Sequence, residues 1–134
     1  MDYRTLGYLT VALAVIVTAP YWLRTLNNWT IKTKDKRFMN ALKFLRKLHK
    51  PLGIVLALLA IWHGYEALLR YQFRLHTGLI AYAGFVITAL LGIWHWRKKN
   101  KQIFKVHKTM ALISVLLVVI HLLWPGAIWQ LLGI

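Results

Sequence analysis

Four long stretches of this chain contain no Asp, Glu, Lys or Arg, and polar or basic segments separate them. The uncharged stretches are residues 5–23, 51–65, 75–96 and 109–134. A helix needs about 20 apolar residues to cross a bilayer core about 30 Å thick. The pattern therefore predicts an all-α integral membrane protein, built as a four-helix transmembrane bundle in a single domain over residues 1–134.

The expected transmembrane helices follow from these stretches and from the polar residues at their ends. They are residues 6–26, 48–71, 77–96 and 102–124, each to within a few positions. We expect Pro20 to kink the first helix, and we expect residues 27–35 to be irregular.

Two further segments lie outside the apolar spans. Residues 36–47 show a helical repeat of apolar positions and predict an amphipathic segment that leads into the second helix, with Asp35 or Thr33 as its N-cap. The Pro125-Gly126 pair ends the fourth helix, so residues 127–134 predict an interfacial tail.

Basic residues are concentrated in two of the connections. Of a formal net charge of +15, nine Lys and Arg lie in residues 24–50 and six in residues 97–108. The positive-inside rule places both connections in the cytoplasm and both termini outside, most simply in the plasma membrane of a prokaryote. An anionic lipid surface accounts for this charge, so nucleic acid is not an expected partner.

A histidine pattern occurs twice with the same spacing. Residues 47–63 read KLHKPLGIVLALLAIWH, and residues 105–121 read KVHKTMALISVLLVVIH. A step of 14 residues is two heptads and rises about 21 Å, so both histidines of a copy lie on nearly the same helix face. The preceding helices are less alike, with YWLR at residues 21–24 beside WHWR at residues 94–97.

The two copies run in the same direction across the membrane, which brings histidines to two matching depths. His49 would meet the level of His107, and His63 that of His121. Two histidines at each level are too few for a zinc site, which usually takes four ligands from the protein. A porphyrin supplies four nitrogens and needs two axial ligands, so the pattern predicts two b-type haems with His49/His107 and His63/His121 as iron ligands.

This arrangement resembles the membrane domain of the ferric reductase and NADPH oxidase superfamily, and also the small di-haem cytochromes of the b561 group. The resemblance is carried by the repeated His-x13-His pattern and covers the second to fourth helices best. It implies transmembrane electron transfer through two bis-histidine haems. The chain differs from ferric reductases in having four expected helices and no Gly-rich dinucleotide motif.

Other residues have two interpretations each. Small residues between the histidines either leave room for a porphyrin or allow close helix packing: Gly53, Ala60, Ala111 and Ser114. Basic residues near the histidines either contact haem propionates or follow from membrane orientation: Lys47, Lys50, Lys105, Lys108, Arg70 and Arg74. His76 and His95 are either interfacial histidines or, for His76 with Glu66, part of a quinone or proton site.

Transmembrane electron transfer is the function that the pattern favours, although it does not define an enzyme. One alternative is a quinone-reactive membrane anchor of a larger oxidoreductase, and another is a transporter of metal ions or haem. The expected partners are the lipid bilayer and either redox proteins or quinone. The chain is also a candidate homo-oligomer or subunit of a larger complex.

Overall fold

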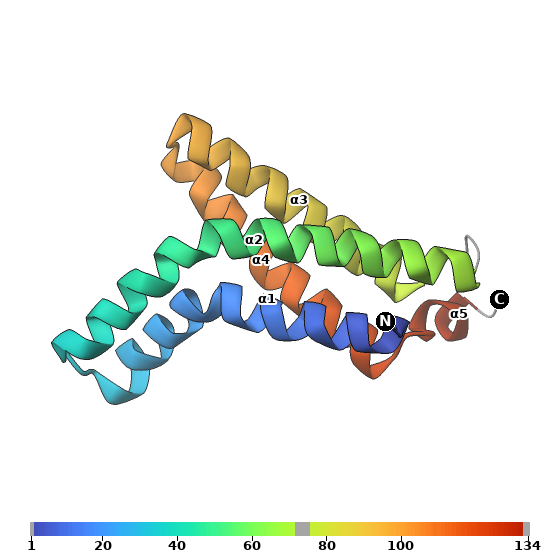
Figure 1. Ribbon diagram of the computed structural model, residues 1–134, viewed down its shortest axis with the longest axis horizontal. Coiled ribbons are helices and arrows are strands. Elements are labelled where there is room, and N and C mark those ends of the chain that lie inside the picture. Colours follow the sequence, from blue (N-terminus) through green and yellow to red (C-terminus); the bar gives the residue numbers. More distant parts are fainter. Residues whose placement is uncertain (1, 72–75, 133–134) are drawn as a thin grey trace. The chain divides into compact units, whose positions relative to one another are not determined.

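The computed structural model describes residues 2–71 and 76–132, and every regular element within those ranges is a helix (Figure 1). The predicted all-α fold class is confirmed for this part of the chain. Two compact units are formed, Met1–His63 and Gly64–Ile134. Each unit contains a helical hairpin, and each hairpin holds one copy of the histidine pattern.

Among the residues that the structure describes, four helices are long and apolar enough to cross a membrane. They cover Tyr3–Ile31, Lys36–Arg70, Thr77–Lys98 and Lys101–Leu123. In the most apolar part of these helices, at most 22% of the residues are buried within the protein. So large an apolar surface is stable in lipid and not in water, which makes the chain an integral membrane protein, as predicted.

The first unit is built from α1 (Tyr3–Leu26), the short π-helix η1 (Asn27–Ile31) and most of α2 (Lys36–Tyr71). The sequence predicts an irregular segment from residue 27, whereas η1 continues α1 for five more residues. The segment predicted to lead into the second transmembrane helix is continuous with it, and α2 is one helix of 36 residues.

The turn between η1 and α2 explains where α2 begins. Lys32 adopts the left-handed conformation, with φ 50°, and ends η1. The Asp35 carboxylate then accepts a hydrogen bond from the Arg37 N–H at 2.9 Å, while the Thr33 hydroxyl accepts one from the Asp35 N–H at 3.1 Å. Asp35 is therefore the N-cap of α2, one of the two residues predicted for that role.

Both helices of the first unit contain a proline, Pro20 in α1 and Pro51 in α2. A proline inside a helix removes one backbone hydrogen bond and bends the helix, as Pro20 is expected to do. In Figure 1, α1 and α2 bend in the same direction near these prolines. The shared bend keeps the two helices side by side up to the turn that joins them.

The second unit contains α3 (Thr77–Lys98), α4 (Lys101–Leu123) and the short helix α5 (Ala127–Leu132). Only two residues join α3 to α4. Lys99 is left-handed, with φ 49°, and the Asn100 side chain accepts hydrogen bonds from the N–H groups of Gln102 and Ile103, which caps α4.

His95 closes this turn. Its Nδ1 atom lies 2.9 Å from the Asn100 carbonyl, and its ring lies 4.8 Å from that of Phe104, centroid to centroid. These contacts give His95 a structural role in the connection between α3 and α4.

The fourth long helix ends before Pro125, as predicted. The chain then forms α5 within the segment that the sequence predicts as an interfacial tail. The Trp124 indole donates a hydrogen bond to the Gln130 side chain at 2.6 Å and ties α5 to the end of α4.

Candidate functional site

His49 lies on α2 and points toward α1 within the first unit. Its Nδ1 atom is 2.8 Å from the main-chain carbonyl oxygen of Val17. A carbonyl only accepts hydrogen bonds, so the Nδ1 atom of His49 must carry the proton. Val17 lies three residues before Pro20 in α1.

His107 has the same type of support in the second unit. Its Nδ1 atom lies 2.9 Å from the main-chain carbonyl oxygen of Thr88 on α3 and is likewise a donor. The Thr88 hydroxyl is bonded to the Gly84 carbonyl and to the Ser114 hydroxyl, each at 2.9 Å. The bond between Thr88 and Ser114 holds α3 against α4 about two turns from His107.

His121 is supported by a side chain. Its Nδ1 atom lies 3.1 Å from the Thr77 hydroxyl, which is also 2.9 Å from the Pro125 carbonyl. The hydroxyl has one proton, and the carbonyl can only accept it. Toward His121 the hydroxyl is therefore the acceptor, which places a proton on Nδ1 of this ring as well.

Three of the four candidate ligands are thus held as the same tautomer by partners on the preceding helix. With the proton on Nδ1, the lone pair of the neutral imidazole is on Nε2. Histidines that bind a metal through Nε2 commonly donate Nδ1–H to a carbonyl or another acceptor, which fixes the ring. These residues therefore fit the role of axial ligands to haem iron.

Glycines allow the imidazoles to approach the neighbouring helix. A Cβ atom added to Gly78 would lie 2.8 Å from Cε1 of His121, and one added to Gly7 or Gly92 would lie 3.0 Å from Cε1 of His63 or His107. Any larger residue at these three positions would displace a histidine ring. The sequence analysis did not identify these glycines, because they lie on the helices without the repeated pattern.

Aromatic rings also contact the histidines farther from the basic connections. The Tyr3 ring lies parallel to that of His63, at 5.3 Å between centroids and 4° between planes. The His76 ring lies 6.2 Å from that of His121, at 25°. His76 therefore packs beside a candidate ligand, whereas the sequence analysis treated it as an isolated interfacial residue or as a partner of Glu66.

The supports of the two units correspond at one constant offset. Gly78 follows Gly7 by 71 positions, and Thr88 follows Val17 by the same number. This differs from the offset of 73 in the similarity between residues 21–24 and 94–97. The contacts with the histidines therefore align α1 with α3 at an offset of 71 residues. The sequence similarity alone would align them two residues differently.

The small residues predicted to face a haem have different surroundings. A Cβ atom on Gly53 would meet nothing within 4 Å, and Ala60 is buried. Ser114 is buried against α3 through its bond to Thr88, whereas Ala111 is half-buried. Gly53 leaves open space beside α2, while the hydroxyl of Ser114 serves helix packing in the second unit.

The basic residues predicted to contact propionates lie on exposed parts of their helices where they are described. These are Lys47, Lys50, Lys105, Lys108 and Arg70. Lys108 also places its ammonium group 5.1 Å from the centroid of the Phe104 ring. Arg74 lies outside the described residues.

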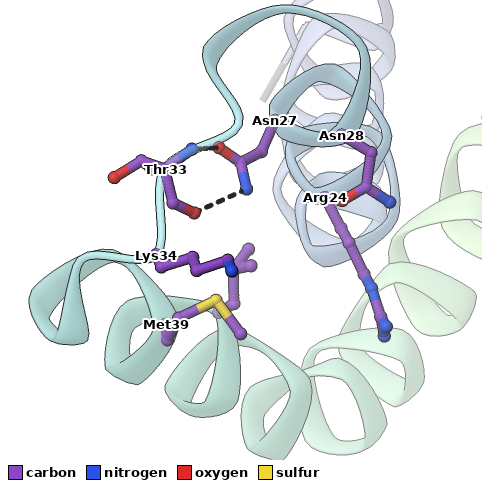
Figure 2. Close-up of a pocket in the computed structure, with 7 residues that line it drawn as sticks. Arg24, Asn27, Asn28, Thr33, Lys34 and Met39 are labelled. Carbon is purple, nitrogen blue, oxygen red and sulfur yellow. Dashed lines mark hydrogen bonds between the residues drawn. The ribbon is translucent and has the colours of Figure 1, made fainter.

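A pocket of about 240 Å³ lies at the turn between η1 and α2 (Figure 2). Asn27 forms one wall and is bonded to both the N–H and the carbonyl of Thr33, at 3.0 and 3.1 Å. Arg24 and Lys34 contribute positive charge, and Met39 an apolar side. The pocket includes none of the candidate histidines, and its buried amide stabilises the turn.

No group of three or more His, Cys, Asp or Glu that could hold a metal ion occurs among the residues that the structure describes. The prediction of metal binding thus gains no support from a conventional cluster of protein ligands, and it depends on histidines that act in pairs. No protein family model, curated protein or solved structure matches this chain. The resemblance to di-haem cytochromes therefore depends on the histidine pattern alone.

Proposed function

We propose that this protein carries electrons across a membrane through two b-type haems. His49 and His107 would bind one iron, and His63 and His121 the other. The observation that carries the proposal is the set of hydrogen bonds that places the proton on Nδ1 of His49, His107 and His121. The shared tautomer leaves an Nε2 lone pair available for iron on each of the three rings.

The chain's own residues would hold the ligands and limit their motion. Val17 and Thr88 orient two imidazoles through main-chain carbonyls, and Thr77 orients a third through its hydroxyl. Gly7 and Gly78 admit the rings of His63 and His121 beside the neighbouring helix. A haem with two axial histidines supplies one-electron chemistry and leaves no open position on its iron.

The distance that electrons would travel follows from α2. His49 and His63 are 14 residues apart on one continuous helix, which corresponds to a rise of about 21 Å. This is a large part of a bilayer core about 30 Å thick. One histidine level would therefore lie toward each membrane surface.

Orientation is also part of the proposal. The basic connections would face the cytoplasm and both termini the outside, in the plasma membrane of a prokaryote. A soluble redox protein or quinone would exchange electrons at one surface, and an acceptor or donor at the other. If the chain is a subunit of a larger complex, electrons would follow the same path through its two haems.

A reduced-minus-oxidised optical spectrum, with haem quantified per chain as the pyridine haemochrome, tests the proposal. We expect two b-type haems in the purified full chain. His49→Ala and His121→Ala should each lower the content toward one haem, because each removes one axial ligand.

His95→Ala is the matched control. This histidine is on a transmembrane helix of the same protein but is bonded to Asn100 in a turn, so the variant should keep both haems. A chain that contains no haem after expression with ample haem supply would contradict the proposal. Equal loss in His95→Ala and His121→Ala would show that the loss reflects folding.

A further inference from the structure

Three consecutive residues at the start of α3 contact His121. The His76 ring lies 6.2 Å from the His121 ring, the Thr77 hydroxyl lies 3.1 Å from its Nδ1 atom, and Gly78 has no room for a Cβ atom beside its Cε1 atom. We call these three residues the α3 cradle. It constrains the ring by stacking, by a hydrogen bond and by steric contact.

Thr77 is the member of the α3 cradle with a chemical effect on the imidazole. Only 6% of its surface is exposed, so water does not compete for its hydroxyl. The hydroxyl proton is directed to the Pro125 carbonyl at 2.9 Å, which leaves an oxygen lone pair for the Nδ1–H group of His121. Thr77 therefore links the His121 ring to the turn at Pro125 that follows α4.

We infer that Thr77 is a positioning residue that fixes the tautomer of His121 and increases electron donation by its Nε2 atom. The inference rests on the proposed function, since it concerns His121 as an axial ligand. An acceptor on Nδ1–H raises the basicity of the opposite nitrogen and favours oxidised iron. Thr77 thus lowers the reduction potential of the haem that His121 ligates.

The effect belongs to the second unit. At the offset of 71 residues, the position that corresponds to Thr77 is Leu6, which is 1% exposed and has no hydroxyl. A ligand in the first unit cannot receive the same hydrogen bond from this position. Removal of the Thr77 hydroxyl should therefore change one of the two proposed haems and leave the other as it was.

The test compares Thr77→Val, which keeps the shape and removes the hydroxyl, with Thr77→Ser, which keeps the hydroxyl. Potentiometric titration of the purified full chain should show one haem potential shifted upward in Thr77→Val and restored in Thr77→Ser. The affinity for the haem that His121 would ligate should fall by about 10–100-fold in Thr77→Val. Thr30→Val is the control, since Thr30 is exposed and its hydroxyl donates to the Leu26 carbonyl four residues earlier, in the first unit.

NMR of the reduced chain labelled with ¹⁵N-histidine gives a second readout. The Nδ1–H group of His121 should exchange with solvent faster in Thr77→Val than in the wild type or in Thr77→Ser. If Thr77→Val leaves both the potentials and this exchange unchanged, the inference is overturned.

A chain without haem would overturn the proposed function and the ligand role of His121 with it. The ¹⁵N shifts of the same sample would then still report the tautomer of His121. A Nδ1-protonated ring that loses this preference in Thr77→Val would support the hydrogen bond assigned to Thr77, and any other result would overturn it. The two failures are therefore distinguishable.

Discussion

The two units support their histidines alike but join their helices differently. Val17 and His49 are 32 residues apart in sequence, whereas their counterparts Thr88 and His107 are 19 apart, a difference of 13. The same difference separates the pair Gly7 and His63 from the pair Gly78 and His121. The extra 13 residues of the first unit therefore lie between Val17 and His49, in the connection and in the helix ends beside it.

This difference shows which part of the hairpin is constrained. Between the two histidine levels, both units keep the same spacing on both helices. Beyond the inner histidines, the second unit turns in two residues, while the first unit adds η1, a buried Asn27 and a shared bend at two prolines. Contacts with the histidines fix the apolar part of each hairpin, whereas the length of the basic connection differs between the two units.

The largest expected effect comes from the glycines that lie against histidines, and it tests whether Gly7 and Gly78 matter equally in the two units. Gly78→Ala and Gly7→Ala should each displace a histidine ring, at a cost of about 1–3 kcal/mol and a corresponding loss of haem. Gly78→Ala should lose more haem per chain, since its Cβ would also lie 2.9 Å from the His76 ring. Gly64→Ala, which meets nothing within 4 Å, is the control for helix propensity. Similar haem contents in all three variants would contradict the packing role.

A smaller effect compares the two connections. Asn27→Ala removes both hydrogen bonds to Thr33 at a buried position and should lower the free energy of unfolding by about 1–3 kcal/mol. Asn100→Ala removes only a helix cap at an exposed position and should cost about 1 kcal/mol. Denaturant titration in detergent would measure both. A larger loss for Asn100→Ala would mean that the short connection, not the long one, depends on its asparagine.

The smallest effect should be the same in both units. Lys32 and Lys99 each adopt a left-handed conformation, which glycine adopts without a steric penalty. Lys32→Gly and Lys99→Gly should each raise the free energy of unfolding by about 0.5–1 kcal/mol. Thermal unfolding of the two variants against the wild type would check this. Stabilisation at only one of the two sites would show that the turns differ beyond their length.

Much of the fold could be predicted because lipid imposes a simple rule on composition. Uncharged spans located all four long helices, and Asp35 was recognisable as an N-cap by its residue type. The extension of α1 by η1 depends on the contact of Asn27 with Thr33 across the turn, which is not a periodic signal. The continuity of α2 with the amphipathic segment before it follows from the helical repeat of apolar positions in residues 36–47.

The candidate site also has a part that the sequence predicts and a part that it does not. Repetition of the histidines along the chain identified the four proposed ligands. Their supports gave little signal, because a main-chain carbonyl is present at every residue, and Val17 and Thr88 share no side-chain chemistry. Thr77 and Gly78 are residue types common in membrane helices, so only the fold connects them with His121.

The choice of main-chain carbonyls as acceptors has a genetic consequence. Most substitutions at position 17 or 88 leave the carbonyl oxygen in place, so a saturation-mutagenesis screen should find His49 and His107 intolerant, while positions 17 and 88 accept different side chains that fit their packed surroundings. Position 77 should accept few replacements other than Ser, because its acceptor is the side-chain hydroxyl. Orientation of His121 would thus require a specific residue at a second position, whereas orientation of His49 or His107 would not.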